Sequence, residues 1–237
     1  MLDRIRHAKS YPFEILDRSY VYRRGKVQEF ETHPKPHRGR MPVLAAGSNQ
    51  SHRQIARKFD DHPSGDIIPS QRGVLHNFDV VYAAHLASYG SVPATFQYSA
   101  GTVVNVFVLW LDKPQVTRMH ETEGNYSFDH LSGVYIELDD GGDILNEAYS
   151  YSSKAGCFNY NDQCVSLSEI AASGRKFKQA TQTEILGMVR DRLAPERVLD
   201  DFVTEHIVDD RVRRERSKAI GQDALALKFE RRVITQL

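Results

Sequence analysis

The apolar run VVNVFVLWL, residues 103–111, constrains the fold of this chain more than any other stretch. It is much shorter than the roughly 18 uninterrupted apolar residues that a membrane helix needs, and it is rich in β-branched and aromatic side chains. Such a run is typical of a central strand that is buried on both faces. Residues 78–86 and 92–99 are further strand candidates joined by glycine-containing turns, so the sequence predicts a sheet with this run at its centre.

Other segments carry hairpin, loop and helix signals around this sheet. Residues 13–30 predict a hairpin that turns at Arg24-Gly25, and residues 134–151 predict a second one across an Asp-Asp-Gly-Gly-Asp turn. Residues 60–73, in which Asp, Pro, Ser and Gly recur, are expected to form a loop. Helices are predicted over residues 166–173, over residues 181–194 and, as an amphipathic run packed on the core, over residues 195–220.

The charge balance of the chain argues against a partner recruited by its overall field. Thirty-one Lys and Arg residues match 31 Asp and Glu residues over 237 positions, so no net charge attracts nucleic acid or an anionic membrane. The N-terminal MLDRIRHAKSYPF has no apolar segment of signal-peptide length, and 41% hydrophobic residues suffice for a buried core. We therefore expect a globular, cytoplasmic protein with neither nucleic acid nor a membrane as its partner, and the sequence indicates no oligomeric state.

The segment VLAAGSN, residues 43–49, is the first half of a candidate site. It is an apolar strand candidate that runs into a Gly-Ser-Asn turn, and the helix-like segment 51–59 follows it. A strand that ends in a tight turn and opens a helix leaves several backbone N–H groups pointing the same way, which suits a carboxylate or an oxyanion. Gly47, Ser48 and Asn49 therefore predict an anion cradle, with an ordinary helix-capping pair at Ser48 and Asn49 as the alternative.

The segment LWLDKPQVTRMHETEGNYSF, residues 109–128, is the second half of the candidate site. Its Asp-Lys-Pro sequence at 112–114 predicts the start of a helix, and Gly124 predicts the end. Glu123 is therefore expected in the last turn, where the negative end of the helix dipole disfavours an ionised carboxylate. An acid in that place is either an exposed surface residue or a functional one.

The histidines and cysteines of this sequence favour no metal site. His33 and His37 have the spacing of two ligands on one helical face, but two intervening prolines exclude a helix there and no third ligand accompanies them. Cys157 and Cys164 cannot form a zinc site by themselves, and a chain of this length does not depend on one disulfide. We expect these two thiols to be buried or without a chemical role.

Three elements taken together resemble the gamma-glutamylcyclotransferase-like superfamily. They are the Gly-Ser-Asn turn after the first core strand, the strand pair PATFQYSAGTVVNVFVLWLD, and a short helix closing on Glu-Gly with a tyrosine just after it. The resemblance spans residues 41–177 and implies an α+β fold, a small mixed β-barrel flanked by helices, with an N-terminal hairpin extension and C-terminal helices. The implied division is an extension and linker at 1–40, the barrel at 41–177 and a helical extension at 178–237.

The resemblance also implies roles for individual residues. Glu123 matches the catalytic acid/base of the family, and the positions implied to bind substrate are Ala46, Gly47, Ser48, Asn49, Tyr126 and Tyr149. Packing is the alternative role for the two tyrosines. Two departures from the family pattern matter: Ala46 stands where a tyrosine usually precedes Gly-Ser-Asn, and Asn105-Val106 stands where Gly-Val is common. The first departure removes an aromatic wall and a hydroxyl from the pocket.

The reaction implied by the resemblance is the cyclisation of a γ-glutamyl amide or dipeptide to 5-oxoproline with release of an amine. It is an amide-cleaving lyase or transferase activity of the kind used in glutathione metabolism. One carboxylate that first accepts and later donates a proton serves both proton transfers, so no metal or organic cofactor is required. We expect Trp110, Phe128 or Tyr126 to form an apolar wall beside Glu123. Glu121 and His120 are the alternative acid–base residues.

Two further hypotheses remain beside the enzyme. The scaffold could bind a γ-glutamyl ligand without turnover, which Ala46 in place of the usual tyrosine permits. Alternatively, the protein could act through a partner that its extensions bind, with the barrel as a scaffold. Formation of 5-oxoproline separates the enzyme from the binding protein, and deletion of residues 211–237 tests the interaction protein.

Overall fold

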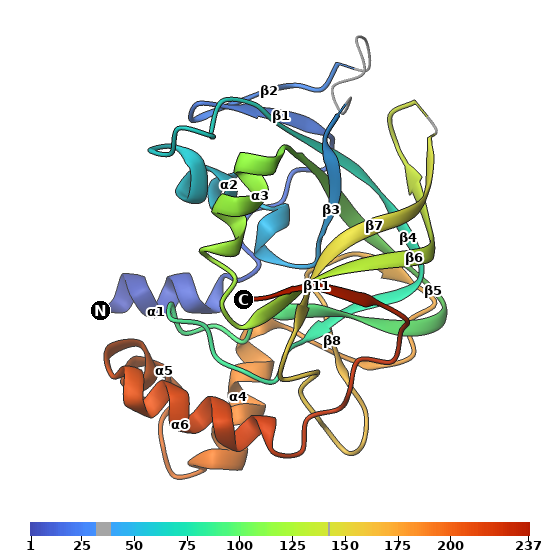
Figure 1. The fold of residues 1–237 in the computed structure, drawn as a ribbon. Coiled ribbons are helices and arrows are strands. Elements are labelled where there is room, and N and C mark those ends of the chain that lie inside the picture. The colour runs from blue at the N-terminus through green and yellow to red at the C-terminus, as the bar shows by residue number, and fades with distance from the viewer. Residues whose placement is uncertain (32–38, 142) are drawn as a thin grey trace.

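Five strands close into a mixed β-barrel in the computed structural model, which describes residues 1–31, 39–141 and 143–237. Around the ring, β4 pairs with β5, β5 with β3, β3 with β7, β7 with β6, and β6 returns to β4. The β3–β7 pair is parallel and the other pairs are antiparallel. The expected α+β fold with a small mixed barrel and flanking helices is therefore confirmed (Figure 1).

The helices and strands follow one another along the chain from a short N-terminal helix to a C-terminal strand. Their bounds are α1 Leu2–Lys9, β1 Tyr20–Arg23, β2 Lys26–Glu29, β3 Met41–Ala45, the 3-10 turn η1 Ser48–Gln50, α2 His52–Phe59, β4 Ile68–Tyr82, β5 Ala94–Leu111, α3 Lys113–His120, β6 Tyr126–Leu138, β7 Ile144–Ser153, β8 Val165–Leu167, β9 Ala172–Ser173, β10 Lys178–Ala180, α4 Gln182–Leu193, α5 Leu199–Val208, α6 Asp210–Gly221 and β11 Arg232–Gln236.

The apolar run 103–111 forms the second half of β5 and is buried on both faces, as its composition predicts. Val106, Val108 and Trp110 pack in one hydrophobic cluster, whereas Phe107 and Leu109 pack in a second one. Alternate residues of a strand point to opposite faces, so one strand contributes to two cores. This double burial places β5 at the centre of the sheet, between β4 and β3.

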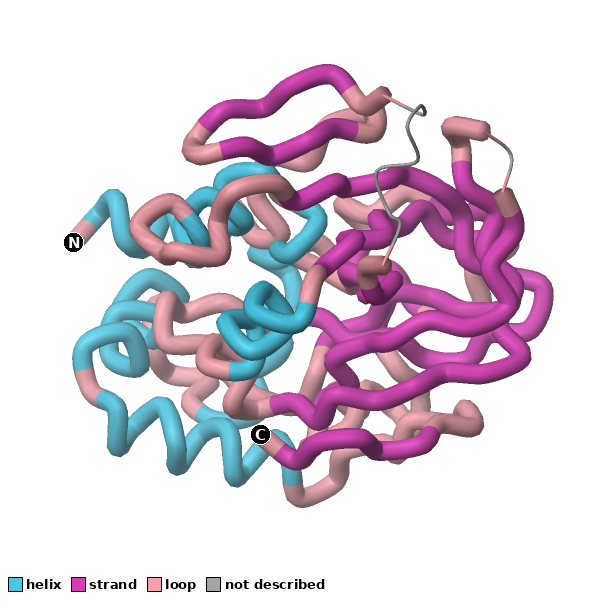
Figure 2. The backbone as a smooth tube through the Cα atoms, turned by 45° about the horizontal axis from the view of Figure 1, so that its top comes forward, coloured by secondary structure: helices cyan, strands magenta, loops and turns pink. Residues whose placement is uncertain are grey.

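One end of the barrel gathers the loops that carry the candidate site. Strands β3, β4 and β7 end there, and β5 and β6 begin there, as the pairings Tyr82↔Ala94 and Tyr126↔Ser153 require. The helices collect on one side of the barrel, with α1, α4, α5 and α6 close together and α2 beside α3 (Figures 1 and 2). The turn after β3 and the turn after α3 thus meet at the same end.

Both terminal segments pack against the barrel. The predicted hairpin turning at Arg24-Gly25 is present as β1 and β2, and β1 pairs with β4. At the other end of the sequence, β11 pairs with β6, and α5 contacts α1. Within the described residues, no helix is both long enough and apolar enough to span a membrane.

Several local expectations are wrong, and the cause is tertiary pairing. Residues 166–173 do not form a helix, because Val165–Leu167 pairs as β8 and the hydroxyl of Ser166 donates to the buried carboxylate of Asp79 at 2.6 Å. The expected loop at 60–73 ends early, since β4 begins at Ile68 and pairs with both β1 and β5. The run 195–220 is two helices, divided at Asp209, which caps α6 with its side chain.

The thiols, one hairpin and one helix agree with the sequence predictions, whereas two further elements were not predicted. Cys157 and Cys164 are buried free thiols, as expected. The predicted hairpin at 134–151 and the helix at 181–194 are present, the helix with a capping box at Thr181. Helix α1 and strand β11 were not predicted. The histidines at 33 and 37 lie outside the described residues.

Candidate active site

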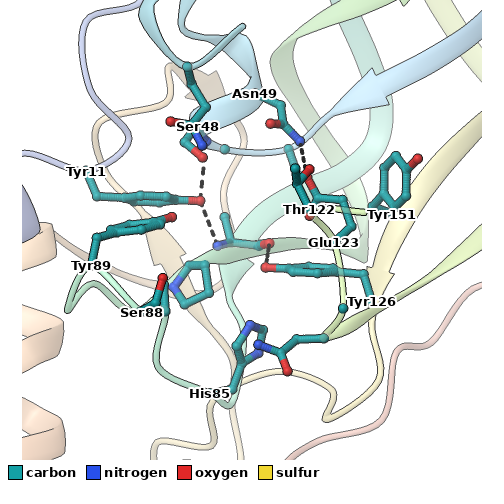
Figure 3. A pocket seen from close by; sticks show the side chains of 18 of the residues that line it. Tyr11, Ser48, Asn49, His85, Ser88, Tyr89, Thr122, Glu123, Tyr126 and Tyr151 are labelled. Carbon is teal, nitrogen blue, oxygen red and sulfur yellow. Dashed lines mark hydrogen bonds between the residues drawn. The ribbon is translucent and has the colours of Figure 1, made fainter. Parts of the chain in front are cut away.

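A cavity of about 430 Å³ lies at the end of the barrel where the loops gather (Figure 3). The turn after β3 and the turn after α3 both line it, so Glu123 and the Gly-Ser-Asn turn meet across one space, as the sequence predicts. The sequence-predicted residues that line this cavity are Ala46, Gly47, Ser48, Asn49, Glu123 and Tyr126. Tyr149 is not among them. Six of the seven site residues predicted from the sequence therefore line this cavity.

Glu123 lies beyond the end of α3 and not in its last turn. The helix ends at His120, and the chain turns through Glu121 and Thr122 before Glu123. The Glu123 residue is only 8% exposed, and its Oε1 accepts a hydrogen bond from Asn49 Nδ2 at 3.0 Å. The side chain of Asn49, in the Gly-Ser-Asn turn, therefore contacts the carboxylate of Glu123 directly.

A buried lysine completes this contact. Lys58 Nζ, on α2, lies 2.5 Å from Glu123 Oε1 and 2.8 Å from Asn49 Oδ1, so the three side chains form a closed polar cluster. Oε1 of Glu123 carries both contacts, and Oε2 has no hydrogen-bond partner among the described residues. A buried charge needs a partner, and here acid and base neutralise one another.

The apolar wall expected beside Glu123 is only partly present. Tyr126 lines the cavity, but the indole of Trp110 donates to Gln71 Oε1 at 3.0 Å inside the barrel, and Phe128 stacks on Tyr149. The sequence carries a signal for Lys58. It occupies the same helical stripe as the buried Ile55 and Phe59, where a charge requires a partner.

Gly47 is required because a tyrosine hydroxyl fills the space beside it. A Cβ at Gly47 would lie 1.9 Å from Tyr11 Oη and 3.0 Å from Ala94 Cβ. The same hydroxyl accepts hydrogen bonds from the N–H groups of Ala94 at 2.8 Å and Ser48 at 3.4 Å. The N–H group of Ser48 is therefore already bound to Tyr11. The N–H groups of Gly47 and Asn49 are the remaining donors of the predicted cradle.

Tyr11 comes from the N-terminal segment, which sequence reasoning left outside the site. It supplies an aromatic ring and a hydroxyl next to Ala46, the position where the family pattern has a tyrosine. Its ring stacks on Tyr89 with the centroids 6.5 Å apart, and Figure 3 shows both rings facing Glu123 across the cavity. Tyr11 is distant in sequence from residues 46–49, so no local pattern in that segment predicts that its ring lies beside them.

The later tyrosines divide between the cavity and the packing around it. Tyr126 donates its hydroxyl to the carbonyl of Ala94 at 3.1 Å. Tyr149 stacks on Phe128, with ring centroids 5.2 Å apart, and belongs to the packing. Tyr151 lines the cavity instead, and its hydroxyl is 2.9 Å from His120 Nδ1.

Burial keeps the aromatic hydroxyls and one imidazole of the cavity uncharged. It raises the pKa of Tyr89 to about 12 and lowers the pKa of His85 to about 4. It also raises the pKa of Tyr11 and Tyr126. His85 packs edge-on against Tyr126, and its buried Nδ1 has no hydrogen-bond partner among the described residues. At neutral pH these tyrosines and His85 therefore carry no charge.

The chemistry open to this cavity is proton transfer and anion binding. Glu123 is the carboxylate, and the turn amides and basic side chains are the electrophilic groups. In the described ranges, no three His, Cys, Asp or Glu side chains are grouped so that they could hold a metal ion.

Comparisons with known proteins found similarity only among solved structures. No protein-family model and no curated protein matches the sequence. A structure described as gamma-glutamyl cyclotransferase has 14% identity and a TM-score of 0.39 over 75% of this chain and 98% of its own. The uncharacterized human protein loc79017 has 16% identity and a TM-score of 0.40 over 82% of this chain and 94% of its own. YkqA from Bacillus subtilis has 14% identity and a TM-score of 0.39 over 72% and 55%. The structures to which this chain is similar thus include one described as a gamma-glutamyl cyclotransferase.

Proposed function

We propose that this protein cyclises a γ-glutamyl amide to 5-oxoproline and releases the amine. The observation that carries the proposal is the 3.0 Å contact between Asn49 Nδ2 and Glu123 Oε1, because it joins the acid to the amide-lined turn in one cavity. The cavity volume of about 430 Å³ is in the range of small-molecule sites. A site with one enclosed carboxylate and a cradle of amides suits a reaction that moves protons and develops an oxyanion.

Glu123 is the proposed general base and acid. The α-ammonium group of the substrate gives a proton to Oε2, the oxygen without a partner in the described residues, and the free amine then attacks the γ-carbonyl carbon. The new C–N bond closes the five-membered ring, and the carbonyl electrons move to oxygen. When the carbonyl forms again, the bond to the departing nitrogen breaks, and Glu123 gives that nitrogen the proton it accepted. The ring nitrogen still carries one proton too many, and the same carboxylate transfers this second proton to the released amine, which leaves as an ammonium while the lactam nitrogen keeps one hydrogen.

The N–H groups of Gly47 and Asn49 are the proposed donors to the oxyanion. They are the cradle donors that remain once Tyr11 has accepted a hydrogen bond from Ser48. Removal of one such donor typically reduces kcat by about 10²–10³-fold in other enzymes. Nucleophile and electrophile belong to the same molecule, so proximity supplies much of the remaining acceleration.

Lys58 and Asn49 are the proposed positioning residues. Both bind Oε1 of Glu123, at 2.5 Å and 3.0 Å, so the carboxylate cannot rotate freely and Oε2 is held toward the cavity.

Product formation by two glutamate variants tests this proposal. Wild type, Glu123→Gln and Glu121→Gln are incubated with a panel of γ-glutamyl dipeptides and amides, and 5-oxoproline is measured. Loss of the acid/base should lower the rate by about 10²–10⁴-fold. Glu121 is the matched control, because it lies in the same turn but pairs with Arg118 at a surface site. Equal rates for wild type and Glu123→Gln across the panel would reject the proposed role.

A second candidate function is a γ-glutamyl-binding protein that does not turn over its ligand. The ion pair between Lys58 and Glu123 supports it, because the pair leaves the acid fully engaged at Oε1. In this case γ-glutamyl dipeptides raise the melting temperature while no 5-oxoproline forms. Product that forms at a rate dependent on Glu123 would exclude this second function.

A further inference from the structure

A second cavity of about 570 Å³ adjoins the candidate active site. The two cavities share four lining residues, Arg57, Ser88, Tyr89 and Arg213, so they lie side by side along one border, which we call the mouth. The remaining walls of the second cavity come from α1, through Asp3, Arg4 and His7, and from α5, through Ile207. The terminal segments therefore build a compartment that the barrel alone lacks.

Positive charge dominates this second compartment. Arg4 and Arg57 have no carboxylate partner among the described residues, and the one acid of the lining, Asp3, pairs with Arg6 at 2.9 Å. Arg213 is neutralised by Asp210. The positive charge of Arg57 acts on His7 in this compartment. Burial is the larger cause that lowers the pKa of His7, and the Arg57 guanidinium lowers it further. Two guanidinium groups are thus left to meet anions from outside the chain.

Arg57 is oriented by an aromatic surface at the mouth. Its guanidinium carbon lies 6.0 Å from the centroid of Tyr89, a residue that lines both cavities. Arg4 is held from the other side, since its Nη2 donates to the carbonyl of Ile207 at 3.2 Å. Guanidinium groups that are held in this way lose less side-chain entropy when they bind a planar carboxylate.

The direction of the proposed reaction connects the two cavities. The γ-glutamyl part must lie against Glu123 and the turn at 47–49, so the amine part extends from the first cavity toward its mouth. Resting on the proposed function, we propose that the second compartment binds the departing amine. Arg4 and Arg57, whose guanidinium groups have no carboxylate partner in the described ranges, select an amine that carries two carboxylates. The substrate is then a γ-glutamyl dipeptide whose second residue is a dicarboxylic amino acid.

Matched substrates and variants test the compartment. KM is measured for γ-glutamyl-glutamate and for γ-glutamyl-glutamine, which differ by one carboxylate at nearly equal size, with wild type, Arg4→Gln and Arg57→Gln. We expect KM to be about tenfold lower for the dicarboxylic peptide with wild type, and this ratio to approach one in both variants. Arg53→Gln is the control on α2, because Arg53 lines neither cavity and pairs with Glu14. It should keep the wild-type ratio.

The outcomes separate this inference from the proposed reaction. If 5-oxoproline forms with equal KM values for the two peptides, the reaction stands and the compartment is overturned. If no peptide is turned over, the melting temperature of the protein is compared with each peptide bound. A larger rise with γ-glutamyl-glutamate that Arg57→Gln removes supports the compartment without the reaction. Equal shifts, or no shift with either peptide, overturn it.

Discussion

Lys58 and Glu123 form an ion pair inside the protein, with Nζ 2.5 Å from Oε1 and side chains that are 7% and 10% exposed. The pair joins α2 to the turn after α3 and is held by Asn49, which contacts both partners. Ion pairs on a protein surface contribute little, but at this depth each partner is costly to leave alone. The pair therefore connects the stability of this end of the barrel with the ionisation of the proposed catalytic acid.

Replacement of Lys58 by methionine should lower turnover. Without the ammonium group, Oε1 of Glu123 loses its contact at 2.5 Å, so the carboxylate is less firmly oriented toward the substrate. We expect kcat/KM to fall about tenfold or more in Lys58→Met, with partial recovery in Lys58→Arg, which keeps a positive charge. The measurement is kcat/KM for the three proteins at one pH. A Lys58→Met protein as active as wild type would show that the lysine does not position the acid.

The same pair should appear in the free energy of unfolding. Removal of one partner leaves the other charge buried and unpaired, so Lys58→Met and Glu123→Gln should each lower stability by about 3 kcal/mol. The double variant has no unpaired charge and should be more stable than the sum of the single losses predicts. Urea unfolding of the four proteins gives the coupling energy. Strictly additive losses would contradict a direct interaction.

A methyl group at Gly47 should disrupt the contact with Tyr11. The Cβ of Gly47→Ala would lie 1.9 Å from the tyrosine hydroxyl, so either the ring or the turn must move. We expect a loss of about 2 kcal/mol or more, with partial recovery in the double variant with Tyr11→Phe, which lacks the hydroxyl. Gly124→Ala is the control in the same cavity, because a Cβ there meets nothing within 4 Å. Thermal unfolding measures all three, and a Gly47→Ala protein as stable as Gly124→Ala would refute the contact.

Two buried histidines should make the protein less stable in acid. Burial lowers the pKa of His85 and of His206 to about 4, below the ordinary value of 6.5. At pH values between these two pKa values, the unfolded chain binds protons at the two imidazoles and the folded chain does not. The free energy of unfolding therefore decreases as the pH falls through this window, and these groups do not affect it above the window. Each imidazole contributes a slope of about 1.4 kcal/mol per pH unit.

Chemical unfolding between pH 4 and 7.5 checks this expectation. Replacing His206, whose Nε2 is 2.9 Å from the carbonyl of Gly90, by glutamine should remove about half of the slope. A slope that does not depend on His206 would show that this imidazole is not the origin of the acid sensitivity.

Patterns that act over short distances were enough to predict the main elements. The apolar run 103–111 becomes the central strand because its side chains are suited to burial on both faces. The turn at Arg24-Gly25 closes the hairpin of β1 and β2, strands β6 and β7 pair as the second predicted hairpin, and Thr181 begins α4 with a capping box. The proximity of Glu123 to the turn at 47–49 was expected from a family resemblance, and the cavity contains both.

Where the sequence failed, a distant partner outweighed the local signal. Residues 166–173 contain helix-forming and capping residues, yet Ser166 is drawn into the sheet by pairing and by the buried Asp79. The last turn of α3 was placed too far along because Gly124 is a good helix terminator, although the chain already leaves the helix after His120. Tyr149 was predicted to bind substrate, whereas Tyr151, two residues later on the same strand, lines the cavity, because spacing alone does not say which ring reaches it.

The sequence by itself therefore determined the central strand, the two hairpins, and the acid and the amide-rich bend on which the proposed chemistry depends. Only the tertiary structure decided the surroundings of that acid. Lys58 on α2 and Tyr11 from the N-terminal segment reach the cavity from parts of the chain far from Glu123. Hydrophobic periodicity reports which face of an element is buried, but it does not report which buried faces meet. The partner of a buried charge or hydroxyl is therefore set by the tertiary fold, which brings distant segments of the chain together.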